Sequence, residues 1–343
     1  MTSLVEQPLV TRARNTDLLE VRQLVVEYGF GVRPARAVDG VDFAIREGEV
    51  LGLAGESGCG KTTIANAVMQ ILRPPGRIAG GSILFEGEDI VGKSTEELRR
   101  YRWRNVSMVL QSAMNALNPV MRVGDQFVDT VQAHEKIDRR RAIARAGELL
   151  ELVGIDARRV SSYPHQLSGG MRQRVVIAMA LALEPELIIL DEPTTALDVV
   201  VQREILQQVD ALKRDFGFAV LFITHDLSLL LEFADRIAIM YAGEVVETAP
   251  AERLGVNPQH PYTQGLLKSF PPLRGPLVPL TGIPGSPPDL RDPPTGCRFH
   301  PRCPHCLPEQ AELYRRQTTE RPRLRVVEEG HEVACHLVAE AGE

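Results

Sequence analysis

The stretch GESGCGKTT at residues 55–63 constrains the fold of this chain more than any other feature. It follows an unbroken apolar run, VLGLA (50–54), and precedes a run with helical spacing, IANAVMQIL (64–72). An apolar strand, a glycine-rich turn and a helix in this order match the phosphate-binding pattern G-x-x-x-x-G-K-[ST] in the context that it requires. The backbone N–H groups of such a loop bind phosphate oxygens, together with the N-terminus of the helix. The sequence therefore predicts a nucleotide-binding α/β fold.

Each residue of the loop has an expected role in binding a nucleotide. Lys61 should reach the β- and γ-phosphates, Thr62 should hold Mg²⁺ and Thr63 should contact the α-phosphate. The other loop positions should contribute mainly their backbone, namely Gly55, Ser57, Gly58, Cys59 and Gly60. The alternative is a glycine-rich turn that matches the pattern by chance, and the strand and helix on either side argue against it.

Two further apolar runs, LIIL (187–190) and AVLFIT (219–224), are separated by a helical run and predict buried strands of a parallel sheet. The first run continues into Asp191 and Glu192. Asp191 should order the magnesium through its water shell, and Glu192 is placed to polarise an attacking water as a general base. Many buried strands end in acids, so this pair indicates a hydrolytic site only together with the phosphate-binding loop.

The stretch LSGGMRQR (167–174) opens another predicted helix. Ser168, Gly169 and Gly170 offer a second helix N-terminus that can bind an anion. Gln173, further along the same predicted helix, is also expected to contact the nucleotide. One nucleotide cannot occupy two such sites in one small domain. We therefore expect a head-to-tail dimer in which this segment covers the γ-phosphate held by the partner.

Five motifs resemble those of the ATP-binding cassette (ABC) ATPases: GESGCGKTT, Gln111 in MVLQ, LSGGM, TTALD (194–198) and His225 in FITHD. The resemblance implies that Gln111 contacts Mg²⁺ and the attacking water, and that His225 bonds the γ-phosphate. It also implies that Tyr28 stacks on adenine and that Asp198 communicates between the two sites of the dimer. An ordinary strand aromatic is the alternative for Tyr28, and a structural histidine is the alternative for His225.

The same resemblance, over residues 18 to 250, implies the fold and the domains. The fold is expected to be α/β, a P-loop NTPase with a RecA-like core, an antiparallel β subdomain and a helical subdomain at about 111–172. The alternation in LLEVRQLVVEY and VDFAI predicts half-exposed strands before the loop, and IAIMYAGEVVET (237–248) predicts a hairpin turning at Ala242-Gly243. The expected divisions are a flexible N-terminus at 1–17, the ATPase domain at 18–256 and an extension at 257–343.

Four other segments narrow the resemblance to the ATPases of the dipeptide and oligopeptide (peptide/nickel) importers. They are QSAMNALNPVMRVGDQ (111–126), NPQHPYTQGLL (257–267), IPGSPPDL (283–290) and GCRFHPRCPHC (296–306). This implies ATP hydrolysis coupled to import of a small peptide, with a paralogous cassette, two permease subunits and an external solute-binding protein as partners. The alternatives are nickel or an oligosaccharide as the solute, a soluble ABC ATPase of DNA repair or translation, and a regulatory cassette that does not hydrolyse ATP.

Composition bounds the setting in which this chain works. The formal net charge of −6 argues against a nucleic-acid partner, because no basic surplus exists to neutralise phosphates. The apolar runs fall short of the ~20 residues that cross a bilayer, and the N-terminus lacks the apolar core of a secretory signal. These observations favour a cytoplasmic location with reduced thiols. The resemblance to importer ATPases implies a peripheral subunit on the cytoplasmic face of the membrane.

Four of the five cysteines lie in the last fifty residues: Cys297, Cys303, Cys306 and Cys335. The Pro-rich segment around them cannot form a core of its own, so a metal cross-link would stabilise it. Four thiolates suit Zn²⁺ or an iron–sulfur cluster, and His305 could compete as a ligand. The resemblance favours a [4Fe–4S] cluster, although the third cysteine of the group usually lies further along. Unligated thiols are the remaining alternative. The role of such a centre is expected to be structural, far from the ATP chemistry and bracing the contact with the partner cassette.

Overall fold

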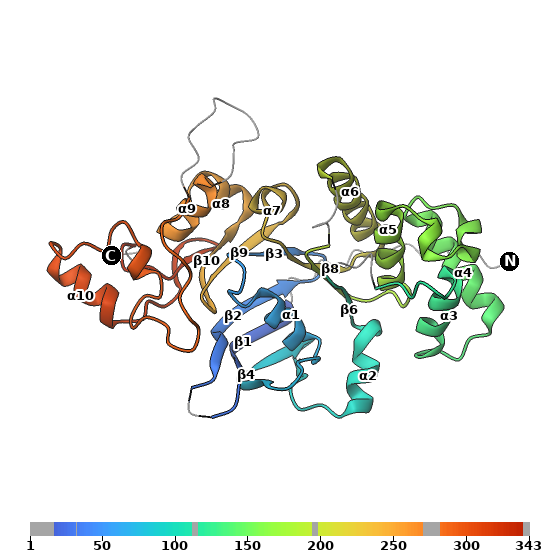
Figure 1. Cartoon of the computed structure of the whole chain (residues 1–343), viewed down its shortest axis with the longest axis horizontal. Coiled ribbons are helices and arrows are strands. Elements are labelled where there is room, and N and C mark those ends of the chain that lie inside the picture. Colours follow the sequence, from blue (N-terminus) through green and yellow to red (C-terminus); the bar gives the residue numbers. More distant parts are fainter. Residues whose placement is uncertain (1–16, 32, 112–115, 194–197, 270–281, 339–343) are drawn as a thin grey trace.

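The computed structural model describes residues 17–31, 33–111, 116–193, 198–269 and 282–338 (Figure 1). Within these ranges no helix is both long and apolar enough to span a lipid bilayer. A central sheet runs across the molecule, with a smaller sheet below it, a group of helices at one end and the C-terminal tail at the other, as Figure 1 shows.

The central sheet has eight strands in the order β11-β12-β10-β9-β3-β8-β7-β6. Its parallel part pairs β3 with β8 and β9, and β7 with β6 and β8. The bounds are β3 (Val50–Ala54), β6 (Val106–Val109), β7 (Leu187–Asp191), β8 (Ala219–Ile223), β9 (Arg236–Tyr241) and β10 (Glu244–Pro250). Every residue of β3, β7 and β8 is buried, which confirms the strands predicted from the unbroken apolar runs.

Successive side chains of these strands alternate between two cores, one on each face of the sheet. In β7, Ile188 and Leu190 join the core that the helical end of the molecule covers. Leu187 and Ile189 join the core shared with the smaller sheet. This is the period of two that a strand imposes on its side chains. The sheet is therefore held by apolar packing on both faces.

The smaller sheet is antiparallel, in the order β2-β1-β4-β5. Its strands are β1 (Asp17–Tyr28), β2 (Ala35–Arg46), β4 (Gly76–Phe85) and β5 (Glu88–Asp89). The predicted strands before the loop are present, but the second is longer than VDFAI indicated, because β2 pairs with β1 along most of its length. The hairpin of β9 and β10 turns at Ala242 and Gly243, both with positive φ, as the sequence predicted.

Helices lie on either side of the central sheet and beyond its β6 edge. The bounds are α1 (Lys61–Val68), α2 (Thr95–Arg104), α3 (Val123–Gln132), α4 (Arg139–Leu152), η2 (Ala157–Ser161), η3 (Pro164–Gln166), α5 (Gly169–Ala180), α6 (Val199–Phe216) and α7 (Leu227–Phe233). In α4, Asp138 is the N-cap and accepts from the backbone N–H of Arg141. Val153 is the C-cap, and Gly154, with φ of 70°, follows it.

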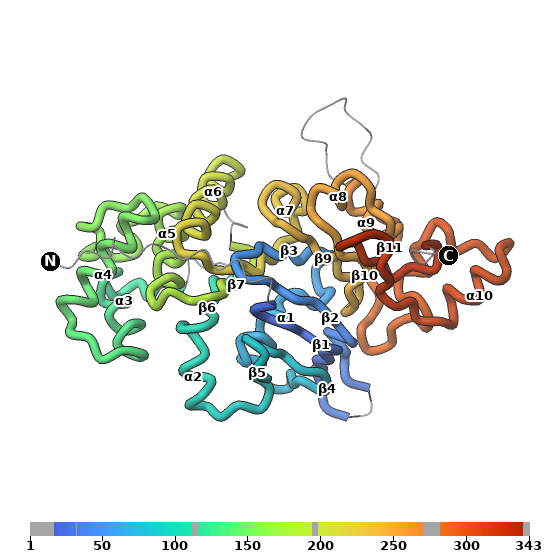
Figure 2. Tube along the Cα trace, turned by 180° about the vertical axis from the view of Figure 1, so that it is seen from behind, coloured from blue at the N-terminus to red at the C-terminus, as the bar shows by residue number. Residues whose placement is uncertain are grey.

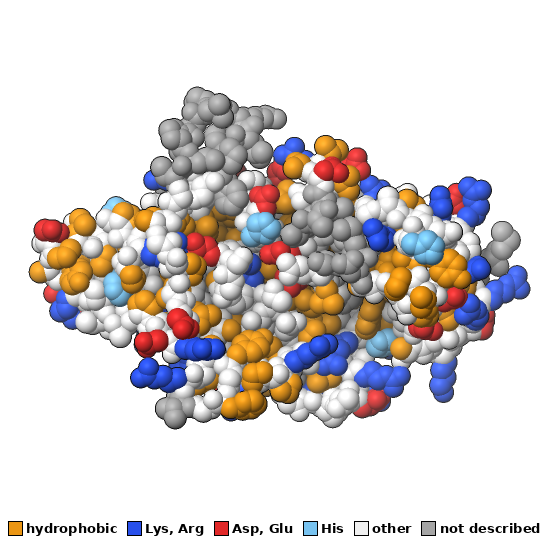
Figure 3. Space-filling view, viewed as in Figure 1, with side chains coloured by type: hydrophobic (Ala, Val, Ile, Leu, Met, Phe, Trp, Pro, Cys, Tyr) orange, Lys and Arg blue, Asp and Glu red, His pale blue; other side chains and the backbone are white. Residues whose placement is uncertain are grey.

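The C-terminal tail is continuous with the central sheet. It comprises α8 (Ala251–Val256), α9 (Pro261–Lys268), η4 (His300–Arg302), α10 (Ala311–Thr319), β11 (Arg325–Glu328) and β12 (His331–Val333). β12 pairs antiparallel with β10, so β11 and β12 add two strands beyond the end of the ATPase motifs. Figure 2 shows β11 and β10 in the same part of the molecule, and β12 lies between the two strands in the sheet. On the face drawn in Figure 3, Lys and Arg side chains along the lower edge are interspersed with Asp and Glu.

Candidate functional site

The glycine-rich loop lies between β3 and α1, at the carboxyl end of the parallel strands. Gly55 and Gly60 have φ of 149° and 112°, which favour glycine. A side chain would also collide with the carbonyl oxygen of Met240 at Gly55, and with that of Ala37 at Gly60. Other residues therefore cannot replace Gly55 and Gly60 without disturbing the loop, which packs closely against β9 and β2. Ser57 and Gly58 are exposed at its surface.

Lys61 begins α1 and is buried against the loop. Its Nζ donates to the carbonyl oxygens of Gly55, at 2.7 Å, and of Glu56, at 3.1 Å. The ammonium thus lies beside the backbone that is expected to surround phosphate oxygens. Cys59 is also buried, and burial raises the pKa of its thiol, so it packs as a small neutral side chain in the way the sequence predicted.

Thr62 and Asp191 come together from neighbouring elements. The hydroxyl of Thr62 donates to Oδ1 of Asp191 at 3.2 Å. Asp191 is buried at the end of β7, and burial raises the pKa of its carboxyl group while the Thr62 hydrogen bond opposes that shift. Hydroxyl and carboxylate oxygens are the ligand types that Mg²⁺ prefers, so this donor set fits the ion expected here.

Glu192 is contacted by both of the other residues expected to act in hydrolysis. The Nε2 of Gln111 donates to Glu192 Oε2 at 2.9 Å, and Nδ1 of His225 lies 3.4 Å from Oε1. The backbone N–H of Glu192 donates to the carbonyl of Ile223 at 2.8 Å. Glu192 has a positive φ of 47°, an uncommon conformation for a residue with a side chain. Three strand ends thus gather these side chains next to Thr62 and Asp191.

Ser168 caps the N-terminus of α5, where its hydroxyl accepts from the backbone N–H of Met171 at 3.3 Å. Gly169 and Gly170 form the first turn, and a side chain added at Gly170 would lie 3.1 Å from Val201 of α6. Gln173 is buried, and its Nε2 has no hydrogen-bond partner among the residues that the structure describes. The predicted helix N-terminus is therefore present, with an amide donor unsatisfied behind it.

Asp198 caps α6 and accepts from the backbone N–H groups of Val200 and Val201 at 3.1 and 3.0 Å. The neighbouring Val199 and Val200 are 62% and 67% exposed, an apolar pair of the kind that a partner surface covers. Residues 194–197 of the predicted TTALD motif lie outside the described residues.

Tyr28 ends β1, and its ring packs against Gly76 of β4, where a side chain would collide with it. Phe30, two residues after Tyr28 in the loop that continues to Gly31, is 88% exposed. The sequence reasoning did not single out Phe30, because a lone aromatic in a glycine-rich turn carries no pattern.

The C-terminal tail contacts the nucleotide loop at Glu56, a contact that the sequence analysis did not predict. The guanidinium of Arg302 forms two hydrogen bonds with the Glu56 carboxylate, at 2.7 and 2.9 Å. The hydroxyl of Tyr262, in α9, accepts from the backbone N–H of Glu56 at 2.9 Å. Sequence reasoning missed these residues because 246 positions separate Arg302 from Glu56 and no local pattern joins them.

The four tail cysteines are free and lie near one another without forming a metal site. Burial raises the pKa of Cys297 to about 12 and that of Cys335 to about 11, and in each case a neighbouring thiol, Cys303, adds to the shift. Burial also raises the pKa values of Cys303 and Cys306. Among the described residues, no group of three or more His, Cys, Asp and Glu is arranged to hold a metal ion. The predicted four-thiolate centre, with His305 as a competitor, is therefore not supported. Neutral thiols attract one another weakly, so packing sets their positions.

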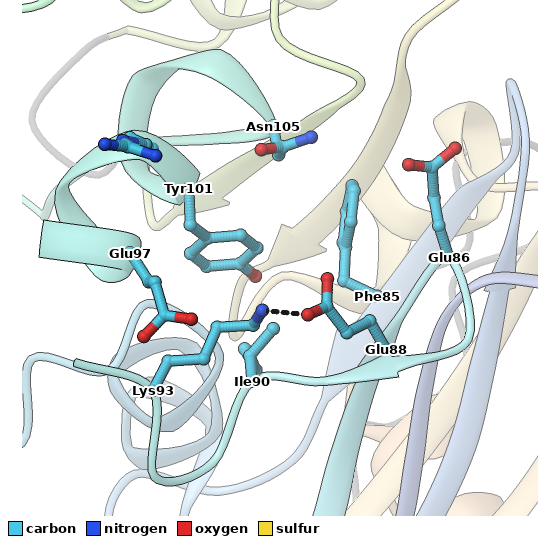
Figure 4. A pocket seen from close by; sticks show the side chains of 9 residues that line it. Phe85, Glu86, Glu88, Ile90, Lys93, Glu97, Tyr101 and Asn105 are labelled. Carbon is cyan, nitrogen blue, oxygen red and sulfur yellow. Dashed lines mark hydrogen bonds and ion pairs between the residues drawn. The ribbon is translucent and has the colours of Figure 1, made fainter.

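A separate cavity of about 320 Å³ lies between α2 and the strands β4 and β5 (Figure 4). Lys93 and Glu88 form an ion pair across it, and Tyr101 and Phe85 meet edge to face in its wall, with ring centroids 5.5 Å apart. None of the residues expected at the nucleotide lines this cavity.

A phosphate-binding loop, a buried acid followed by a glutamate, and a serine-capped helix on a sheet of this order define an ABC-type nucleotide-binding cassette. The family described as "ABC transporter" matches residues 38–195, and "Oligopeptide/dipeptide transporter, C-terminal region" matches residues 246–309. The chain is 46% identical to the oligopeptide transport ATP-binding protein OppD of Bacillus subtilis, over 86% of this chain and 83% of that protein. It is 41% identical to the dipeptide transport ATP-binding protein DppD of Escherichia coli, over 93% and 96% of the two chains. The chain belongs to this family of oligopeptide and dipeptide transport ATP-binding proteins.

Solved structures of cassettes share the fold. A dimeric structure of the ATP-binding cassette MJ0796, in a post-hydrolysis state bound to ADP and Pi, superposes with a TM-score of 0.60 at 27% identity. The match covers 68% of this chain and 99% of that one. A structure of cbiO1 from Clostridium perfringens, part of an ABC transporter complex, gives a TM-score of 0.61 at 27% identity, over 70% and 91% of the two chains. The predicted α/β cassette fold is confirmed.

Proposed function

We propose that this chain hydrolyses ATP to energise the import of di- or oligopeptides through an ABC transporter. The observation that carries the proposal is the meeting of Gln111 and His225 on the carboxylate of Glu192, beside Thr62 and Asp191. A carboxylate held by two neighbours at the end of a buried strand is suited to orient and deprotonate a water. The curated relatives named as peptide transport ATP-binding proteins supply the peptide part of the proposal.

Each residue of the site has a defined task in this proposal. The loop residues Gly55, Ser57, Gly58, Cys59 and Gly60 and the side chains of Lys61 and Thr63 bind the phosphates, and Tyr28 stacks on adenine. Thr62, Asp191 and Gln111 would hold Mg²⁺, which supplies charge neutralisation to the phosphate oxygens. Glu192 accepts the proton of the attacking water, and His225 bonds the γ-phosphate.

The site is completed by a second cassette in head-to-tail arrangement. Ser168, Gly169, Gly170 and Gln173 would face the γ-phosphate bound by the partner, and Asp198 would pass the state of one site to the other. Dimeric cassettes among the similar structures support this arrangement. Replacing Ser168 with Arg should impair hydrolysis while nucleotide binding at the chain's own Lys61 loop stays within ~2-fold of the parent. Equal loss of both would assign Ser168 a local structural role, since it caps α5.

The partners that we propose are a paralogous cassette, two permease subunits and an extracytoplasmic solute-binding protein. The chain would sit on the cytoplasmic face of the membrane as a peripheral subunit. Nickel or an oligosaccharide as the solute, and a soluble ABC ATPase without a transporter, are the alternatives. The matches to the ABC transporter family and to the oligopeptide/dipeptide transporter C-terminal region favour a transport subunit over a soluble ABC ATPase.

Reconstitution tests the proposal. The chain, its partner cassette, the permeases and the binding protein, placed in lipid vesicles with ATP, should take up a labelled tripeptide and hydrolyse ATP faster when the peptide is present. The same vesicles containing Lys61→Ala should do neither. Uptake of Ni²⁺ or an oligosaccharide instead of peptide would show that the proposed solute is wrong. ATP hydrolysis whose rate does not depend on the permeases or the solute would overturn the transport function.

A metal centre at Cys297, Cys303, Cys306 and Cys335 is the finer part of the proposal, with a [4Fe–4S] cluster ahead of Zn²⁺. The proximity of the thiols supports it, but the four side chains would have to deprotonate and draw closer before they could bind an ion. The chain purified without oxygen should contain about four irons and absorb visible light. One zinc and no iron would exclude the cluster, and neither metal would exclude any centre.

A further inference from the structure

The side chain of Arg302 contacts one residue of the nucleotide loop, Glu56. Its two terminal nitrogens hydrogen-bond the two oxygens of Glu56, in the forked geometry that is the strongest arginine–carboxylate contact. The Arg302 side chain is 6% exposed and that of Glu56 is 25% exposed. A guanidinium buried to this degree requires a partner, because an unpaired charge in the interior is strongly destabilising.

The rest of the Arg302 environment holds the guanidinium in place. Its Nε donates to the carbonyl of Pro284 at 2.8 Å, and its Cζ lies 5.7 Å from the centre of the Tyr241 ring. Tyr241 in turn packs with Tyr262 and Phe299, with ring centroids 4.6 and 5.2 Å apart. Contacts with β9, α9 and the tail therefore hold Arg302 in position, in addition to its contact with the loop.

The backbone of Glu56 is held from the same side. Its N–H donates to the hydroxyl of Tyr262, which is fully buried. That N–H is thus committed to the tail and cannot bind a phosphate oxygen. The first residues of the loop are positioned by contacts from α9 and η4. Within the loop, the N–H of Cys59 donates to the carbonyl of Glu56 at 3.2 Å, so the position of Glu56 also shapes the turn that follows it.

The other end of the loop is reached through a second arginine of the same short segment. Arg298 donates to the carbonyl of Ala242, in the turn between β9 and β10. The next residue in that turn, Gly243, donates its N–H to the carbonyl of Cys59 at 3.0 Å. Arg298 and Arg302 lie between Cys297 and Cys303, so residues 297–303 touch the loop at its entry and, through one turn, at its exit.

We propose that the tail segment 297–303 positions the ATP-binding loop, and that Arg302 is a positioning residue that acts through Glu56. A carboxylate in a loop that surrounds a triphosphate repels the ligand unless its charge is neutralised. Arg302 neutralises Glu56 and draws it away toward the tail. This inference deepens the proposed function and rests on it, since it assigns a task to residues outside the ATPase motifs.

Three variants of the full chain test the inference, with the dissociation constant of Mg·ATP as the readout. Arg302→Met should weaken binding ~10-fold or more, because Glu56 is left unpaired next to the phosphates. Glu56→Gln in the Arg302→Met background removes the repelling charge and should restore affinity to within ~3-fold of the parent. A tail that acts only by stabilising the fold would instead lower the free energy of unfolding of Arg302→Met and leave the dissociation constant of the folded variant unchanged. In the assembled ATPase, Arg302→Met should raise KM and leave kcat within ~2-fold.

Arg315→Met is the matched control, since Arg315 makes an exposed ion pair with Glu312 in the same tail and does not contact the loop. It should bind Mg·ATP like the parent. If Arg302→Met fails to fold, Glu56→Asp serves instead, because it shortens the acid and leaves the tail intact; ~5-fold weaker binding is expected. Unchanged affinity in the folded Arg302→Met or Glu56→Asp variant, or a double variant no better than Arg302→Met, would overturn the inference. A parent chain that binds no ATP would overturn the proposed function itself.

Discussion

The nucleotide-binding end of the central sheet and the C-terminal tail are held in place by different forces. In β3, β7 and β8 every side chain is buried, and the two faces of the sheet pack into apolar cores. The tail contributes Phe299 to that core, and it is also attached by several ion pairs. Arg298 and Arg321 contact Asp39 and Glu244, and Arg302 contacts Glu56.

This difference separates the two regions experimentally. Apolar burial responds little to pH or to the loss of one charge. Buried ion pairs and buried histidines do respond, because each depends on the protonation or the presence of a specific partner. Changes at the catalytic end should therefore alter chemistry without altering attachment of the tail, and changes in the tail should first alter its attachment.

The largest expected effect is on turnover at the catalytic end. Glu192→Gln removes the proposed base and keeps the shape of the side chain, so the hydrolysis rate in the assembled transporter should fall ~10²–10⁴-fold. ATP affinity and the rate at which a protease cleaves the tail should stay at parental values. Hydrolysis near the parental rate would show that another group accepts the proton.

Arg298→Met should produce the largest effect on stability. The change removes the buried partner of Asp39 and Glu244 and leaves them the half-exposed Arg321, so the loss should approach but not exceed the about 3–5 kcal/mol typical of breaking a buried pair. Chemical denaturation followed by circular dichroism measures the loss, and limited proteolysis should find cleavage after residue 282 before cleavage in the sheet. Arg315→Met, at exposed pairs with Glu312 and Glu320, should leave the free energy of unfolding close to the parental value. If the protease cleaves the sheet and the tail at the same rate, the two regions do not differ in how they are held in place.

A smaller effect is expected from acid. Complete burial lowers the pKa of His260 from 6.5 to about 3, and its Nε2 has no hydrogen-bond partner among the described residues. Below pH 6.5 the unfolded chain binds the proton and the folded chain does not, so stability present above that pH is lost as the pH falls toward 3. By pH 5 the loss should reach about 2 kcal/mol.

His260→Asn keeps a side chain that can accept from the backbone N–H of Tyr262 and does not titrate. Its free energy of unfolding should therefore change less between pH 7 and pH 5 than that of the parent. Parallel curves for the two proteins would mean that His260 is not the group that responds to acid.

Several residues predicted for the nucleotide site come together in the structure because local context fixes their positions, and their roles stay predictions. Thr62 follows a glycine-rich turn and Asp191 ends an apolar strand, and parallel strands place both at one edge of the sheet. The length of β2 was underestimated because pairing with β1 extends it beyond its own alternating pattern. The contacts of Arg302 and Tyr262 with Glu56 arise from the path of the tail through space. Nothing in the neighbouring residues encodes that path.

The pairing of β12 with β10 also determines how this chain can be shortened for recombinant work. The pairing involves only Glu247 with Val333 and Thr248 with Glu332, yet it covers the outer edge of the ATPase sheet. A version ending after the last ATPase motif would expose the N–H and C=O groups of β10 to other molecules, and such open edges template aggregation. Removing the tail for easier crystallisation should therefore yield material that self-associates through β10, and a version that retains residues to 338 should remain monodisperse.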